Sequence, residues 1–151
     1  MLTQDRLIGD WVAARTGGKF TEGVAIGYIA NDVVMAGCVF EQYNQRSIAM
    51  HIAGDRFSKE FLRYVFWYAF DYLKVNRVIG NIDSTNAKSI KWAERIGAKL
   101  NCVIPECGRE GDMLIYSLTR QNCRYLRGYH ESEERRSAST TECAGHDQAA
   151  A

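Results

Sequence analysis

The sequence predicts an α/β (α+β) fold with a central mixed sheet, in which an antiparallel meander is followed by a parallel βαβ crossover, a short helix and a terminal hairpin. Two observations lead to this prediction. Two apolar runs of strand character, Ser47 to Ala53 and Arg77 to Ile82, are separated by about two dozen residues of helical periodicity, enough for a right-handed crossover. Three strand-like runs joined by short polar turns lead into this unit.

The crossover contains the longest amphipathic pattern in the chain. The first apolar run ends in Gly54-Asp55, a breaker pair that also offers a helix N-cap. From Ser58 to Lys74, apolar residues then recur at three- and four-residue spacing, which predicts a long helix with one broad buried face. The residues of that face are Phe61, Leu62, Val65, Phe66, Ala69, Phe70 and Leu73.

The residues before the crossover predict one helix and a meander. Apolar residues at helical spacing indicate a helix over Thr3 to Arg15, which the glycine pair Gly17-Gly18 ends. Three strands are predicted to follow, separated by Asn31-Asp32 and Asn44-Gln45: Val24 to Ala30, Val33 to Tyr43 and Ser47 to Ala53.

The residues after the crossover predict a capped helix, a hairpin and a tail. Asn86 is the expected N-cap of a short helix that Gly97 ends. The strands Ala98 to Ile104 and Asp112 to Thr119 are expected to pair across the long link PECGREGD. Residues 1–126 therefore form one predicted domain. Residues 127–151 are almost free of apolar side chains and are predicted to be a disordered polar tail.

Composition excludes several classes of function. A net charge of +1 gives no bulk attraction to nucleic acid or to an anionic membrane, and no apolar run is long enough to span a bilayer. The acidic start lacks the features of a signal peptide, so we expect a cytoplasmic protein. Five cysteines without CxxC spacing indicate reduced, mostly buried thiols and no metal site, although a pairing of Cys102 with Cys107 stays open.

Several short motifs carry a resemblance to a known family. Asn86-Ala87-Lys88-Ser89 opens a helix that closes on Gly97-Ala98, after the strand that begins at Arg77-Val78. With the predicted order of elements, this pattern resembles the GNAT superfamily of N-acyltransferases over Leu2 to Leu126. It looks most like small members carried by bacteriophages and bacteria, and these typically lack the first strand of the fold. The resemblance thus implies a bacterial cell, a phage origin and no first strand.

The resemblance implies direct acetyl transfer from acetyl-CoA to an amine acceptor. The pyrophosphate of this coenzyme A thioester would bind where the long helix begins, at Gly54, Arg56, Phe57, Ser58 and Lys59. The strand before that loop would supply an amide for the developing oxyanion, around His51 and Ile52. The pantetheine arm would lie between the two parallel strands, and Asn86 would hydrogen-bond it.

Two departures from the family pattern affect these expectations. The loop from Gly54 to Lys59 lacks the later glycines of the family, although Arg56, Ser58 and Lys59 add donors and charge. The tyrosine that many members place seven residues after the asparagine, where it protonates the leaving thiolate, is Ala93 here. A thiolate can leave without full protonation, so this change does not by itself abolish catalysis.

The candidate catalytic residues are His51, Glu41 and Tyr43. His51 could deprotonate the incoming amine, and Glu41 and Tyr43 could bind a cationic amine or act as the base. Each also has a structural interpretation, as a hydrogen-bonded histidine or a solvated strand end, and Asn86 could be only a helix cap. A GNAT-fold binding or assembly module with weak or no catalysis is the alternative function. The acceptor is not identified, and pairing of two chains through the last strand or the aromatic helix stays open.

Overall fold

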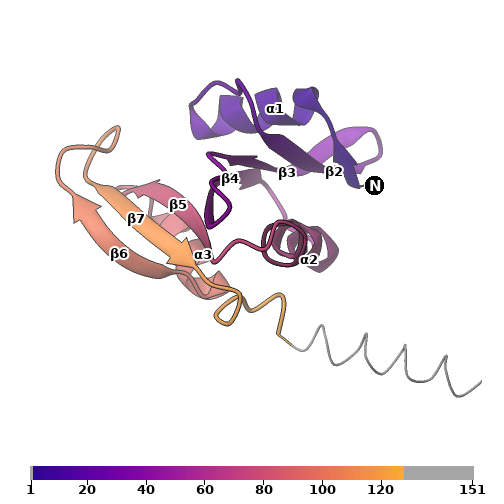
Figure 1. Cartoon of the computed structure of the whole chain (residues 1–151). Helices are drawn as coiled ribbons and strands as arrows, with labels where there is room; N and C mark the ends of the chain where they lie inside the picture. The colour runs from indigo at the N-terminus through magenta and orange to yellow at the C-terminus, as the bar shows by residue number, and fades with distance from the viewer. Residues whose placement is uncertain (1, 128–151) are drawn as a thin grey trace, which may run out of the picture.

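The computed structural model of the chain describes residues 2–127, which form a seven-stranded sheet with helices on both faces (Figure 1). The strand order is β1-β2-β3-β4-β5-β7-β6, and only β4 and β5 run parallel. The elements in chain order are β1 (Leu2–Gln4), α1 (Arg6–Thr16), β2 (Val24–Ala30), β3 (Val33–Glu41), β4 (Ser47–Gly54), α2 (Lys59–Trp67), the π-helix η1 (Tyr68–Tyr72), β5 (Arg77–Asp83), α3 (Ala87–Ile96), β6 (Lys99–Ile104) and β7 (Met113–Leu118). The predicted fold class is confirmed.

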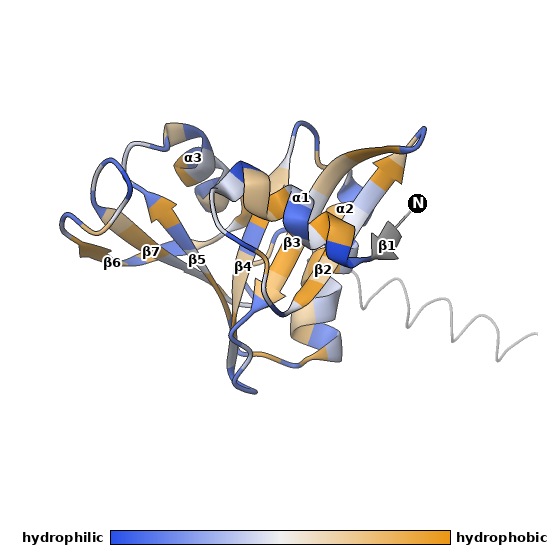
Figure 2. Cartoon of the chain, turned by 90° about the horizontal axis from the view of Figure 1, so that it is seen from above, coloured by the Kyte–Doolittle hydropathy of each residue, from blue (hydrophilic) through white to orange (hydrophobic). Residues whose placement is uncertain are grey.

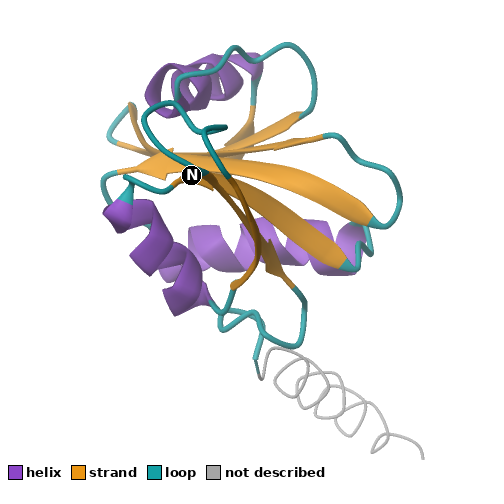
Figure 3. Ribbon diagram, turned by 90° about the vertical axis from the view of Figure 1, so that its left-hand side faces the viewer, coloured by secondary structure: helices purple, strands orange, loops and turns teal. Residues whose placement is uncertain are grey.

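Two hydrophobic cores lie on opposite faces of the sheet (Figure 3). The larger one joins α2 and α3 to the strands, and its most buried large side chains include Phe40, Phe61 and Phe66. The smaller one lies under α1, where Ile8 and Val12 pack on β2 and β3. The long alternating strands β2 and β3 supply side chains to both cores, so they are apolar along most of their length.

The parallel strands β4 and β5 are paired at one end only. Their register joins Ser47 to Arg77, Ile48 to Val78 and Ala49 to Ile79, and stops there. Beyond that point β4 continues beside β3 alone and β5 beside β7 alone, and Figure 2 shows the two strands diverging. The splayed strands that the resemblance implies are therefore present. The second half of each strand presents a backbone edge to the space between them.

The start of the chain corrects two predictions. A first strand, β1, pairs antiparallel with β2, so the expectation that this strand would be missing is wrong. The helix accordingly begins at Arg6 rather than Thr3, with the Asp5 carboxylate accepting a hydrogen bond from the backbone N–H of Leu7. Three residues are too few to show strand alternation, so the sequence pattern does not distinguish β1 from a first turn of the helix.

The long helix of the crossover also differs from its prediction at both ends. Its N-cap is Ser58, whose hydroxyl accepts from the N–H of Phe61, and Asp55 lies outside the helix. Its last five residues form the π-helix η1, in which the N–H of Leu73 reaches the carbonyl of Tyr68. A π-turn still buries Ala69 and Phe70, so the apolar spacing does not distinguish it from an α-turn.

The short helix α3 matches its prediction at both caps. Asn86 Oδ1 accepts from the N–H of Ser89 at 3.1 Å, and Gly97 ends the helix in the left-handed conformation with φ 105°. A Cβ on Gly97 would collide with the backbone carbonyl oxygen of Asn122. This glycine is thus required both by its φ and by the close approach of the chain that follows β7.

Replacing Gly97 by alanine should lower the free energy of unfolding by about 1–3 kcal/mol, because the left-handed conformation strains a residue with a Cβ. Urea denaturation measures this change. Gly18→Ala is the matched control, since a Cβ there meets nothing within 4 Å and φ is not positive. Equal stability of the two variants would show that α3 can end without a glycine.

Other expectations concern cysteines, membranes and metals. Cys38 and Cys123 are buried, whereas Cys102 and Cys107 are exposed and unpaired, so within residues 2–127 the thiols are not mostly buried. No helix in that range is long and apolar enough to cross a membrane. The same residues contain no cluster of three or more metal-binding side chains. The predicted tail lies outside the described residues, apart from residue 127.

Candidate active site

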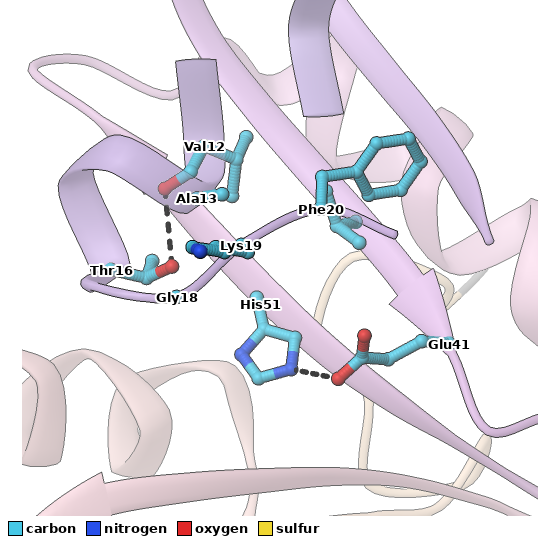
Figure 4. Close-up of a pocket in the computed structure, with 9 residues that line it drawn as sticks. Val12, Ala13, Thr16, Gly18, Lys19, Phe20, Glu41 and His51 are labelled. Carbon is cyan, nitrogen blue, oxygen red and sulfur yellow. Dashed lines mark hydrogen bonds and ion pairs between the residues drawn. The ribbon is translucent and has the colours of Figure 1, made fainter. Parts of the chain in front are cut away.

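A small pocket of about 80 Å³ lies below the C-terminal end of α1, over β3 and β4 (Figure 4). Its apolar wall includes Val12, Phe20 and Val39, and its polar side includes Glu41 and His51. The helix ends here because Gly17, at φ 77°, donates its N–H to the carbonyl of Ala13. The next residues, Gly18 to Phe20, form one side of the pocket.

His51 and Glu41 form a hydrogen-bonded pair in this pocket. The imidazole Nε2 lies 2.7 Å from Glu41 Oε1, and both side chains are partly exposed, at 36% and 27%. They share a face because His51 lies opposite Val39 on β3, two residues before Glu41, and alternate residues of a strand point the same way. That face is the one covered by α1. His51 also lies two residues beyond the last pair of β4 with β5, beside the splay.

Tyr43 is not part of this pair. It follows the end of β3 and is 49% exposed, and its hydroxyl donates to the carbonyl of Leu73 at 3.5 Å, near the end of η1. The strand alternation that links Glu41 to His51 stops at Glu41. The structure therefore brings together two of the three predicted catalytic residues and leaves Tyr43 elsewhere.

The loop from Gly54 to Lys59 leads into the N-terminus of α2, as predicted. Arg56 and Lys59 are exposed there, and the first N–H groups of the helix lack intrahelical acceptors. Ser58 caps the helix with its hydroxyl. Phe57 is half-buried and packs against Phe61 and Trp92, with ring centroids 6.2 and 5.4 Å apart, so its ring fixes the loop to α2 and α3.

Three further predicted binding residues lie around the splay. Ile52 is on the part of β4 that has no partner on the β5 side, and its side chain packs on the larger core. Gly54 ends β4, where a Cβ would crowd Ala36 and the carbonyl of Met35 on β3. Asn86 follows β5, and its capping bond uses Oδ1 and leaves the amide nitrogen as a donor.

The link between β6 and β7 is tied both to β5 and to the end of α1, which the sequence pattern does not predict. Asp83, at the end of β5, accepts from the N–H groups of Glu110 and Gly111 and from Thr85. Arg109 Nη2 donates to the carbonyl of Gly17 at the end of α1. The link thus spans from β5 to the rim of the pocket. The signal for it was the acceptor-rich Asp83-Ser84 pair facing a glycine-rich link.

These bonds make the link sensitive to acid. The N–H of Glu110, followed by the N–H and hydroxyl of Thr85, holds the pKa of Asp83 well below its usual range. A lowered pKa in the folded state stabilises the protein above the unfolded pKa of about 3.9, and that stabilisation is lost as the pH falls toward the folded pKa. The protection factors of the Glu110 and Gly111 amides against exchange should therefore fall below pH 4. Asp83→Asn should remove this pH dependence, and an unchanged dependence would exclude Asp83 as its cause.

Comparisons with known proteins identify the family of this chain and support the fold. Residues 8–99, more than half of the chain, match the family described as the acetyltransferase (GNAT) domain. No curated protein matches the chain in sequence. In fold the chain is similar to a chimera of the Vibrio cholerae spermidine N-acetyltransferase SpeG and hSSAT, at 15% identity and TM-score 0.62, over 83% of this chain and 98% of that one.

It is also similar to a GNAT-family acetyltransferase from Bacillus anthracis, at 16% identity and TM-score 0.54, over 70% of each chain. At such identities a structural likeness shows the fold, whereas the family match extends through α1 to α3. The chain therefore belongs to the GNAT acetyltransferase family, enzymes that transfer an acetyl group to an amine.

Proposed function

We propose that the protein is an acetyl-CoA-dependent N-acetyltransferase in which His51 is the general base and Glu41 orients it. The observation that carries this proposal is the His51–Glu41 pair, which lies beside the point where β4 and β5 separate. The pair faces α1, and the exposed cationic loop before α2 lies past the end of β4. An amine and a thioester arriving from these two sides would meet at the splay.

The chemistry needs one proton acceptor and one oxyanion donor. The amine nitrogen attacks the thioester carbonyl carbon, the N–C bond forms, the C–S bond breaks and the thiolate leaves. Glu41 engages Nε2 of His51, which leaves Nδ1 to accept the proton that the amine loses. The free backbone edge of β4 around Ile52 can supply an N–H to the developing oxyanion. Ala93 has no acidic proton to give, so solvent protonates the thiolate in this mechanism.

The coenzyme A end would bind at the start of α2. The pyrophosphate would accept from the N–H groups of the first helical turn, with Arg56 and Lys59 adding positive charge, while Asp55 and Glu60 oppose it. The pantetheine amides would hydrogen-bond the facing edges of β4 and β5, and the Asn86 amide nitrogen would add a donor. The start of α2 therefore offers N–H donors and two cations to an anionic thioester, although the loop lacks the later glycines of the family.

Calorimetric titration of the full chain with acetyl-CoA tests this function, with S-acetylpantetheine, which lacks the pyrophosphate, and desulfo-coenzyme A as controls. We expect micromolar binding that requires the pyrophosphate, followed by coenzyme A release when an amine is added. Absence of heat and of thermal stabilisation at millimolar acetyl-CoA would contradict the proposal. That result would favour the alternative of a GNAT-fold binding module without catalysis.

A further inference from the structure

The charges around the pocket below α1 are unequal. The lining residues include one carboxylate, Glu41, and its Oε1 is already hydrogen-bonded by His51 at 2.7 Å. The lining also includes Lys19, which is exposed and has no hydrogen bond or ion pair to any other residue that the structure describes. Figure 4 shows Lys19 between Thr16 and Phe20 and above the imidazole of His51 in this view. With His51 neutral, as a general base requires, Lys19 and Glu41 balance within the lining, so a further cation at the rim decides the net charge.

Two carbonyl groups near the end of α1 are already hydrogen-bonded. A helix C-terminus ordinarily attracts cations through its unpaired carbonyl groups. Here the carbonyl of Ala13 accepts from the N–H groups of Gly17 and Gly18, and that of Val12 accepts from the Thr16 hydroxyl. These two carbonyl groups therefore already have donors.

A second cation, the guanidinium of Arg109, lies at the rim of the pocket. The guanidinium of Arg109 lies against Gly17 and donates to its carbonyl, between the lining residues Thr16 and Gly18. A guanidinium has five N–H donors, so this bond leaves others for a ligand. Asp83 and Ser84 fold the link that carries Arg109, which keeps the guanidinium near the pocket. Lys19 and Arg109 thus lie at one end of the pocket and the His51–Glu41 pair at the other.

We propose that the acceptor amine carries an anionic group, such as a carboxylate, which Lys19 and Arg109 bind while His51 meets the amine. This inference rests on the proposed acetyl transfer and specifies its substrate class. The hydrocarbon between the two ends contacts the apolar wall that includes Val12 and Phe20. The pocket is small, about 80 Å³, and is partly open to solvent, so a short acceptor suffices to reach both ends. A polyamine would meet two cations, Lys19 and Arg109, and a single carboxylate, Glu41.

Three four-carbon primary amines that differ only at the far end test this inference: 4-aminobutanoate, butylamine and 1,4-diaminobutane. With acetyl-CoA, we expect kcat/KM for 4-aminobutanoate to exceed that for butylamine by about 10-fold or more, because a charge-assisted hydrogen bond is gained. The diamine should be the poorest of the three. Spermidine should be equally poor.

Lys19→Glu should reverse the order, raising KM for 4-aminobutanoate and favouring 1,4-diaminobutane. Arg6→Glu makes the same charge change at the exposed, opposite end of α1 and should leave the order unchanged. If no amine is acetylated, the binding of the three amines to the coenzyme A complex is compared by calorimetry. Carboxylate-dependent binding that is lost in Lys19→Glu would support the inference.

The remaining outcomes overturn it. Acetylation that favours the diamine or is indifferent to the far end would exclude an anionic acceptor while leaving the proposed acetyl transfer intact. An order that Lys19→Glu does not change would exclude Lys19 as the anion-binding residue. Failure of the wild-type chain to bind acetyl-CoA would instead remove the proposed function and this inference with it.

Discussion

Replacing His51 by glutamine should lower kcat for acetyl transfer by about 100-fold or more, since general-base catalysis contributes roughly 10²–10⁴-fold. Glutamine keeps a polar group near Glu41 but cannot accept and release the proton. The acid limb of the pH–rate profile, which reports protonation of the base, should disappear together with the rate. Steady-state release of coenzyme A as a function of pH measures both effects.

Two further substitutions separate a base from a structural histidine. Glu41→Gln should lower kcat less than His51→Gln does, because it removes the group that orients the imidazole and leaves the imidazole itself. Tyr43→Phe should leave kcat unchanged, because the Tyr43 hydroxyl contacts Leu73 and not the pair. An acid limb that persists in His51→Gln would assign the proton to another group and return His51 to a structural role.

Reversing both charges of the loop, with Arg56→Glu and Lys59→Glu, should weaken acetyl-CoA binding by roughly 10- to 100-fold. Each residue would otherwise place a cation beside the phosphates, and a hydrogen bond to a charged group contributes about 1.5–3 kcal/mol. Both side chains are exposed, so the melting temperature should change little. Ser58 is unsuitable for this test, because its hydroxyl caps α2.

Arg6→Glu with Lys74→Glu is the matched control for that pair. It makes the same change in net charge at exposed positions in α1 and after η1. We expect this control to bind acetyl-CoA as the wild type does, apart from a general weakening that rising salt removes. If control and test variants bind equally, the start of α2 does not hold the pyrophosphate.

The sequence predicted best where local pattern and local chemistry agree. Asn86 and Gly97 mark the ends of α3 because a side-chain cap and a left-handed glycine act within one turn of the helix. The crossover was recognisable because its helix buries a stripe wide enough to show in the spacing of residues such as Phe61 and Phe66. The family resemblance selected His51 and Glu41 as candidates, and the strand pairing of the structure brings the two side chains together.

The features that sequence did not predict depend on pairings between distant residues. The strand β1 is held by β2, 26 residues further along at its first pair, and three residues carry no pattern of their own. The pocket forms only when the end of α1 lies over β3 and β4, so Lys19 and Phe20 had no local signal. Arg109 reaches Gly17 from a link 92 residues away, and composition does not foretell such a contact.

The incomplete pairing of β4 with β5 has a consequence for solvation. Backbone N–H and C=O groups almost always find a partner, yet the ladder between these strands ends at Ala49 and Ile79. In the free protein, water hydrates the facing edges. A ligand that carries amide groups along its length can replace that water bond for bond and leave the rest of the sheet in place. The unpaired edges of β4 and β5 are therefore hydrated before a ligand binds. Part of the ligand's affinity then comes from hydrogen bonds that replace those to water.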